Sequence, residues 1–157
     1  MAAKRSVDGT CVRLRLSLTI APALSIAAVD VLMNHARKVD VTNLHQRSGA
    51  WSVLSCVLLA IVVCLSVLPS RLAALAAGLV AGGTLGNLIS AQQNNGWIPN
   101  PIVAARVAFN VGDVFVLLGV PLLVVALARV AILNREHIDR HIPPRRWERA
   151  LRRRLGL

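Results

Sequence analysis

Charge is missing from long stretches of this sequence. Hydrophobic residues make up 55% of its 157 residues, and the segment Trp51–Leu68 contains no charged residue. A helix in the core of a water-soluble domain normally keeps a polar face toward solvent. The uncharged segment therefore argues against a soluble fold and for a membrane protein.

Cysteine and histidine are scarce as well. Cys56 and Cys64 fall inside an apolar segment, so the three cysteines give no disulfide framework. Cys11 follows Asp-Gly-Thr, unlike the lipidated cysteine of a lipoprotein, which follows an apolar stretch. The four histidines have no metal-ligand spacing, and we expect no metal and no cofactor. The first apolar segment lacks a small-residue cleavage site at its end, so we expect no cleavable signal peptide.

Four long apolar blocks are present: Leu14–Met33, Trp51–Leu68, Leu72–Ile89 and Val114–Leu133. Each has about 18–20 residues, which is enough for a helix to cross a hydrocarbon core of ~30 Å at ~1.5 Å per residue. We therefore predict an all-α fold, a bundle of four transmembrane helices with external loops. The external segment from residue 90 to residue 109 is expected to be a loop, because Pro99 and Pro101 would break a helix there.

The placement of basic residues predicts the orientation in the membrane. The net charge is +11. With four spans, thirteen basic residues lie on the side of both termini and the link at Arg71, and four lie on the other side. The positive-inside rule then places both termini in the cytoplasm. Because these basic residues flank membrane spans, we expect membrane lipids as partners and no nucleic acid.

Three regions are predicted along the chain: a cytoplasmic leader at 1–12, a membrane domain at 13–133 and a basic cytoplasmic tail at 134–157. In the tail, Trp147, Leu151 and Leu155 recur every fourth residue among arginines. This spacing predicts a basic amphipathic helix on the inner leaflet, with a solvated tail as the alternative.

Glycine also recurs every fourth residue, at Gly78, Gly82 and Gly86 in the third block. Such a stripe of small residues lets another helix approach closely in a membrane. We therefore predict that this block packs tightly against a neighbouring helix.

Polar residues are predicted to converge near the external ends of three spans. With the amino terminus inside, Asp30, Asn87, Asn110 and Asp113 fall at similar depth, just below the outer interface. Carboxylates inside membrane spans are costly and commonly mark a functional site. Capping of helix ends by Asn and Asp is the structural alternative.

Two motifs resemble those of lipoprotein signal peptidase, also called signal peptidase II. GGTLGNLIS (Gly82–Ser90) resembles its Gly-Gly-x-x-Gly-Asn-Leu-Ile-Asp-Arg motif, and FNVGD (Phe109–Asp113) resembles its Phe-Asn-x-Ala-Asp motif. Asp30 falls where the family has an aspartate, and Ser48–Ala50 resembles part of its Asn-x-Gly-Ala-Ala-Phe segment. The resemblance covers about residues 12–133 and implies a multi-pass protein of the bacterial plasma membrane.

Members of that family are aspartic peptidases that remove the signal peptide from lipid-modified prolipoproteins. Asp113 matches one of their two catalytic aspartates. Aligning GWIPNP (Gly96–Pro101) with the segment that carries the other places Asn100 at the second position. Ser90 stands where the family has an aspartate, and Arg47 where it has an asparagine.

The change at Asn100 has a chemical consequence. An aspartic peptidase needs two carboxylates that share a proton, so that one activates water and the other polarises the scissile carbonyl. A carboxamide cannot take a proton from water, although it can donate and accept hydrogen bonds. The resemblance therefore implies a degraded dyad of Asp113 and Asn100.

The expected function is a non-catalytic binding or accessory subunit. Its partner would be a lipidated or transmembrane peptide, or a larger membrane complex. The residues expected to contact that partner are Asp30, Asn87, Asn110, Arg47 and Ser90. Two alternatives stay open: a divergent active signal peptidase, including one in which Asp30 supplies the second carboxylate, and a small transporter or channel subunit.

Overall fold

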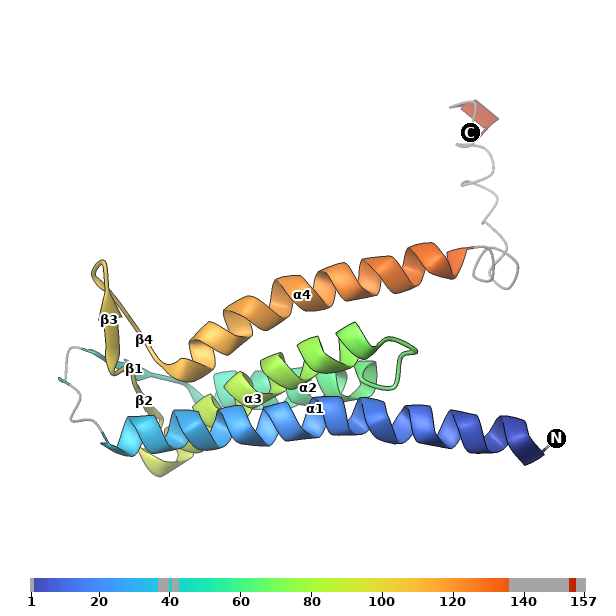
Figure 1. Ribbon diagram of the computed structural model, residues 1–157. Coiled ribbons are helices and arrows are strands. Elements are labelled where there is room, and N and C mark those ends of the chain that lie inside the picture. The colour runs from blue at the N-terminus through green and yellow to red at the C-terminus, as the bar shows by residue number, and fades with distance from the viewer. Residues whose placement is uncertain (1, 37–39, 41–42, 136–152, 155–157) are drawn as a thin grey trace.

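The computed structural model describes residues 2–36, 40, 43–135 and 153–154, and the side chains only from residue 11 onward. In chain order the elements are α1 (Ala2–Ala36), β1 (Leu44–Gln46), α2 (Gly49–Leu65), α3 (Arg71–Gln93), β2 (Trp97–Pro99), β3 (Ile102–Ala104), β4 (Val107–Phe109) and α4 (Val111–Leu133). The helices lie side by side, with the strands gathered at one end (Figure 1). The expectation of a mostly helical chain is confirmed.

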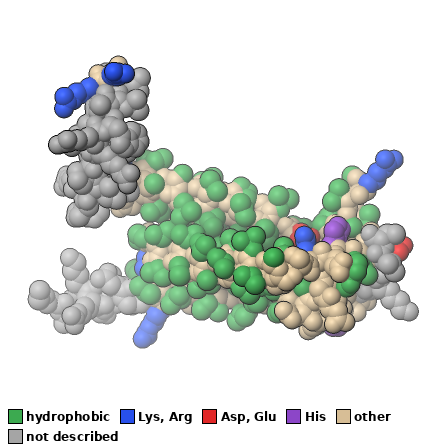
Figure 2. All heavy atoms as spheres, turned by 180° about the vertical axis from the view of Figure 1, so that it is seen from behind, with side chains coloured by type: hydrophobic (Ala, Val, Ile, Leu, Met, Phe, Trp, Pro, Cys, Tyr) green, Lys and Arg blue, Asp and Glu red, His purple; other side chains and the backbone are tan. Residues whose placement is uncertain are grey.

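Three helices are long and apolar enough to cross a membrane: Cys11–Ala36 of α1, α3 and α4. α2 is apolar but has only 17 residues. Hydrophobic side chains cover the helical body on the face that Figure 2 shows, while charged and histidine side chains gather toward its ends. This distribution fits a protein whose helices lie in lipid.

α3 lies at the centre of the bundle and packs against α1 through its glycine stripe. A Cβ atom at Gly82 would lie 2.8 Å from Cβ of Ile26, and one at Gly86 would lie 2.8 Å from Oδ2 of Asp30. Contacts at this range leave no room for a side chain, so the prediction of close helix packing is confirmed. Because Gly78 meets Thr19 and Gly86 meets Asp30, the two helices run in the same direction.

The opposite face of α3 packs against α4. A Cβ atom at Gly119 would lie 2.8 Å from Cγ2 of Val80, and Gly83 meets the backbone of Gly112. These contacts pair the beginning of α4 with the later part of α3, so α4 runs antiparallel to α3. The buried core between the helices consists mainly of alanines of α3, which Val62 of α2 and Leu123 of α4 cover.

Two small antiparallel sheets occupy segments that the sequence predicted as loops. β1 pairs with β2, and β3 pairs with β4 as a hairpin. The prediction of a plain loop from residue 90 to residue 109 is wrong, because α3 continues to Gln93 and three strands follow. Both prolines fit this arrangement, since Pro99 ends a short edge strand and Pro101 precedes the next one. The strict all-α prediction is wrong for these segments.

The structure describes the backbone of most of the predicted leader but little of the predicted tail. The backbone of α1 is helical from Ala2 onward, so the helix runs without a break through the leader boundary predicted at residue 12. Most of the tail, including Trp147, Leu151 and Leu155, lies outside the described residues.

Candidate functional site

The first turn of α4 holds a capping box. The Oδ1 atom of Asn110 accepts a hydrogen bond from the backbone N–H of Asp113 at 2.8 Å. In return, the Oδ2 atom of Asp113 accepts one from the backbone N–H of Asn110 at 3.3 Å. Reciprocal bonds of this kind satisfy two N–H groups that a helix start otherwise leaves without partners.

α3 adds Asn87 to this cap. Its side-chain nitrogen donates to Oδ1 of Asp113 at 3.0 Å, and its oxygen accepts from the side chain of Asn110 at 2.5 Å. Both oxygens of Asp113 therefore accept hydrogen bonds from the protein. The amide groups hold the carboxylate against the positive end of the α4 dipole, where a negative charge is favoured.

α1 contributes a second carboxylate at the same place. Asp30 is fully buried, and its Oδ1 atom accepts a hydrogen bond from the backbone N–H of Gly112 at 2.7 Å. Its Oδ2 atom accepts one from the side chain of Asn34 at 3.2 Å, and the same Asn34 nitrogen donates to the hydroxyl of Ser90 at 2.9 Å. Two acids from different helices thus accept hydrogen bonds from one helix start, Asp113 from the backbone N–H of Asn110 and Asp30 from that of Gly112.

The predicted convergence of Asp30, Asn87, Asn110 and Asp113 is confirmed by these bonds. The geometry also matches the capping alternative, since each of the four residues bonds the first turn of α4 or another member of the group. The network joins α1, α3 and α4 at one level of the bundle, and it is buried apart from half-exposed Asp113.

Asn100 lies in a different set of bonds. Its side-chain nitrogen donates to the carbonyl of Ala108 at 3.2 Å and contacts Nδ1 of His45 at 2.7 Å. Since a carbonyl only accepts, this nitrogen is a donor, and Nδ1 of His45 must accept from it. Within the described part of the chain, Asn100 and Asp113 share no hydrogen bond.

The side-chain oxygen of Asn100 has no hydrogen-bond partner among the described residues, although the residue is only 4% exposed. Its backbone N–H donates to the carbonyl of Asn43 at 3.1 Å. Asn100 therefore connects the segment before β1 to the β3–β4 hairpin, and it leaves a buried acceptor that a bound N–H donor could satisfy.

Arg47 stands between β1 and α2. Its guanidinium carbon lies 5.2 Å from the ring centroid of Trp51, within the range of a cation–π contact, and its backbone N–H donates to the carbonyl of Gly96 at 2.7 Å. Its buried Nε atom has no partner in the described structure. No hydrogen bond between described residues links it to the network of Asp30 and Asp113.

The residues expected at the site left out three groups that the structure brings into these networks. Asn34 lies near the same end of its apolar block as Asp30, four residues later and therefore on the same helix face. His45 and the backbone N–H of Gly112 carried no local signal, since their partners are 55 and 82 residues away.

Comparisons with known proteins identify no relative: no family model, no curated protein and no solved structure matches this chain. Among the described residues, no group of three or more His, Cys, Asp and Glu side chains could hold a metal ion. The hydrogen-bond networks are therefore the basis for a functional assignment.

Proposed function

We propose that the chain is a four-span protein of the bacterial plasma membrane with both termini in the cytoplasm. The direction of the helices supports this topology. α1 and α3 run parallel, so the chain between Ala36 and Arg71 must return to the first side before α3 begins. α2 lies in that return segment and, at ~1.5 Å per residue, its 17 residues cover roughly 26 Å of a core of ~30 Å.

We propose further that the protein resembles signal peptidase II in fold but binds its ligand without cleaving it. The observation that carries this proposal is the bonding of Asp113, whose two oxygens accept from Asn87 and from the backbone of Asn110. A carboxylate that caps a helix in this way is poorly placed to take a proton from water. The residue at the second dyad position is an amide bonded to His45 and Ala108, and it provides no second carboxylate.

The proposed ligand is a lipidated or transmembrane peptide in extended form. Such a segment offers backbone N–H groups, and the buried oxygen of Asn100 accepts such a donor. The neighbouring sheets are short and two-stranded, so an extended peptide could also pair with a free strand edge.

Complementation tests the loss of catalysis. A bacterial strain depleted of its own lipoprotein signal peptidase is given this chain, with a family member that has both aspartates as positive control. We expect no rescue of growth, and no cleavage of a diacylated prolipoprotein by the purified protein. Rescue that Asp113→Ala abolishes would overturn the proposal.

A binding assay tests the proposal that the protein binds a lipidated peptide. A fluorescent diacylated prolipoprotein peptide should bind the purified protein in detergent and stay intact. Asn100→Ala removes the buried acceptor and should weaken binding by about tenfold, the effect of losing one hydrogen bond to a desolvated group. Asn134→Ala, at the exposed far end of α4, is the matched control and should leave binding unchanged.

One observation favours an active peptidase as a second candidate. Asp30 bonds the backbone of Gly112, the residue before Asp113, so two carboxylates lie close together at one helix start. Close acids of this kind can share a proton. This candidate requires that Asp30→Asn and Asp113→Asn each abolish cleavage, whereas Asn100→Ala leaves it intact.

A further inference from the structure

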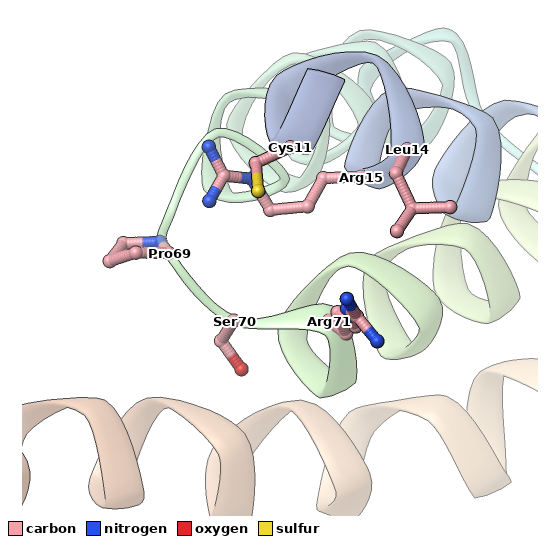
Figure 3. Close-up of a pocket in the computed structure, with 6 residues that line it drawn as sticks. All are labelled: Cys11, Leu14, Arg15, Pro69, Ser70 and Arg71. Carbon is pink, nitrogen blue, oxygen red and sulfur yellow. The ribbon is translucent and has the colours of Figure 1, made fainter. Parts of the chain in front are cut away.

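A second polar site lies at the opposite end of the bundle from the Asp30–Asp113 network. A cavity of about 190 Å³ opens there between the early part of α1 and the link from α2 to α3. Its described lining residues are Cys11, Leu14, Arg15, Pro69, Ser70 and Arg71, and Figure 3 shows Arg15 projecting from α1 and Arg71 at the start of α3, after the Pro69–Ser70 link. The volume is several times the ~30 Å³ that one water occupies in the liquid.

The described lining of this cavity is basic. Two of the six lining residues that the structure describes are arginines, and none of the six is acidic. Among the side chains that the structure describes, neither Arg15 nor Arg71 forms an ion pair, and the buried Nε atom of Arg15 has no hydrogen-bond partner. A buried guanidinium nitrogen without an acceptor is costly, so an anionic group in the cavity would stabilise it.

The position of Arg71 points to an anion as well. It is the first residue of α3, directly after the N-cap Ser70. A cation is unfavourable at this positive end of a helix, where N–H groups favour a negatively charged ligand. Arg71 therefore lies where a bound anion would offset its unfavourable interaction with the α3 dipole.

We propose that this cavity is a binding site for the headgroup phosphate of an anionic phospholipid, held by Arg15 and Arg71. Guanidinium groups bind phosphate oxygens in a bidentate manner, and two arginines together can neutralise the headgroup. This inference does not rest on the peptidase-like function of the other site.

A lipid fits better than a soluble phosphate because of the surroundings. Arg15 lies within the apolar segment Cys11–Ala36 of α1, and its neighbours Leu14 and Leu16 are exposed. The site therefore sits where exposed apolar side chains begin, the level of headgroups in a bilayer. The basic-residue count predicts that this end faces the cytoplasm, where anionic lipids are enriched.

The test compares lipid retention by variants of the full-length protein. Native mass spectrometry of detergent-purified protein titrated with phosphatidylglycerol or phosphatidylcholine should show one preferred phosphatidylglycerol adduct. The pair Arg15→Gln and Arg71→Gln should weaken phosphatidylglycerol binding by about tenfold or more, because two charge-assisted contacts are lost. Arg13→Gln removes one positive charge, as each single substitution of the pair does, from an exposed position on α1, and should leave the adduct unchanged.

Three outcomes would overturn the lipid site. These are equal binding by the double variant and the wild type, equal loss in Arg13→Gln, or displacement of the lipid by millimolar inorganic phosphate, which would identify a site for soluble phosphate instead. Arg71 is exposed at a helix start, so Arg71→Gln alone should fold. If the double variant fails to fold, a loss of phosphatidylglycerol binding in that single variant supports the site, and unchanged binding overturns it.

Discussion

Asn110 takes part in both a helix cap and a contact between two helices. It is fully buried, it caps α4 through its side chain, and it donates to Asn87 of α3. Its carboxamide therefore acts on one helix start and on one helix–helix contact at once. Few side chains of similar size could reproduce both roles, because they need an acceptor and a donor at fixed positions.

Replacement of this residue by alanine tests the cap. Asn110→Ala should lower the stability of the detergent-solubilised protein by about 1–3 kcal/mol, since it removes an N-cap and leaves the oxygen of Asn87 without its partner. Thermal unfolding followed by circular dichroism measures this. Asn134→Ala, which removes an exposed amide at the other end of α4, should change stability by no more than about 0.5 kcal/mol. Equal effects of the two substitutions would contradict the assigned role.

At the residue scale, the sequence predicted which polar side chains lie close together, but it did not predict which hydrogen bonds they form. Asp30, Asn87, Asn110 and Asp113 could be placed at one level because each lies near the same end of an apolar block. Their partners within the cluster could not be predicted, since capping depends on backbone geometry at Gly112 and Asp113. Asn100 was expected opposite Asp113, but its bonds to His45 and Ala108 arise from strand pairing between distant segments.

At the scale of elements, α3 determines how the bundle packs. Its glycines let α1 approach on one face and α4 on the other, so both neighbours contact α3 backbone to backbone. In lipid, such close packing takes the place of the hydrophobic driving force that operates in water. The period of four in Gly78, Gly82 and Gly86 correctly predicted close packing against a neighbouring helix, because it follows from helix geometry alone. The structure identifies that neighbour as α1.

Gly86→Ala tests this packing at its polar end. The added Cβ would lie 2.8 Å from Oδ2 and 2.9 Å from Cβ of Asp30, so α1 and α3 must move apart. We expect a loss of about 1–3 kcal/mol in stability, which is the usual effect of overpacking. Gly49→Ala adds the same methyl group where nothing lies within 4 Å, and its thermal midpoint should match that of the wild type.

The strands were harder to predict than the helices. Each has three residues, and the pairing of β1 with β2 brings together residues 55 positions apart, as in Leu44 opposite Pro99. A three-residue strand is too short to show the alternation of apolar and polar residues that identifies longer strands. Pro99 and Pro101 therefore indicated a loop from residue 90 to residue 109, although backbone groups of this segment pair.

At the scale of the whole molecule, the two ends of the bundle differ in chemistry. The end with the strands holds Asp30, Asp113 and the amides that bind them. The end with the α2–α3 link presents Arg15 and Arg71 around a cavity. The excess of basic residues at the end with the α2–α3 link would orient the protein with that end toward the cytoplasm.

The number of membrane spans determines whether both termini lie on the same side of the membrane. Reporter fusions can measure the side on which each terminus lies. α1 and α3 run in the same direction, so both can cross the bilayer only if the segment that contains α2 crosses back. We therefore expect a fluorescent protein to be active in the cytoplasm, and alkaline phosphatase to be inactive, at both the amino and the carboxyl terminus. Alkaline phosphatase inserted in the exposed β3–β4 turn at Ala105 should be active, because four spans place that turn outside. Termini on opposite sides would mean that three helices span the membrane. α1 and α3 would then cross in opposite directions, which would contradict their parallel packing.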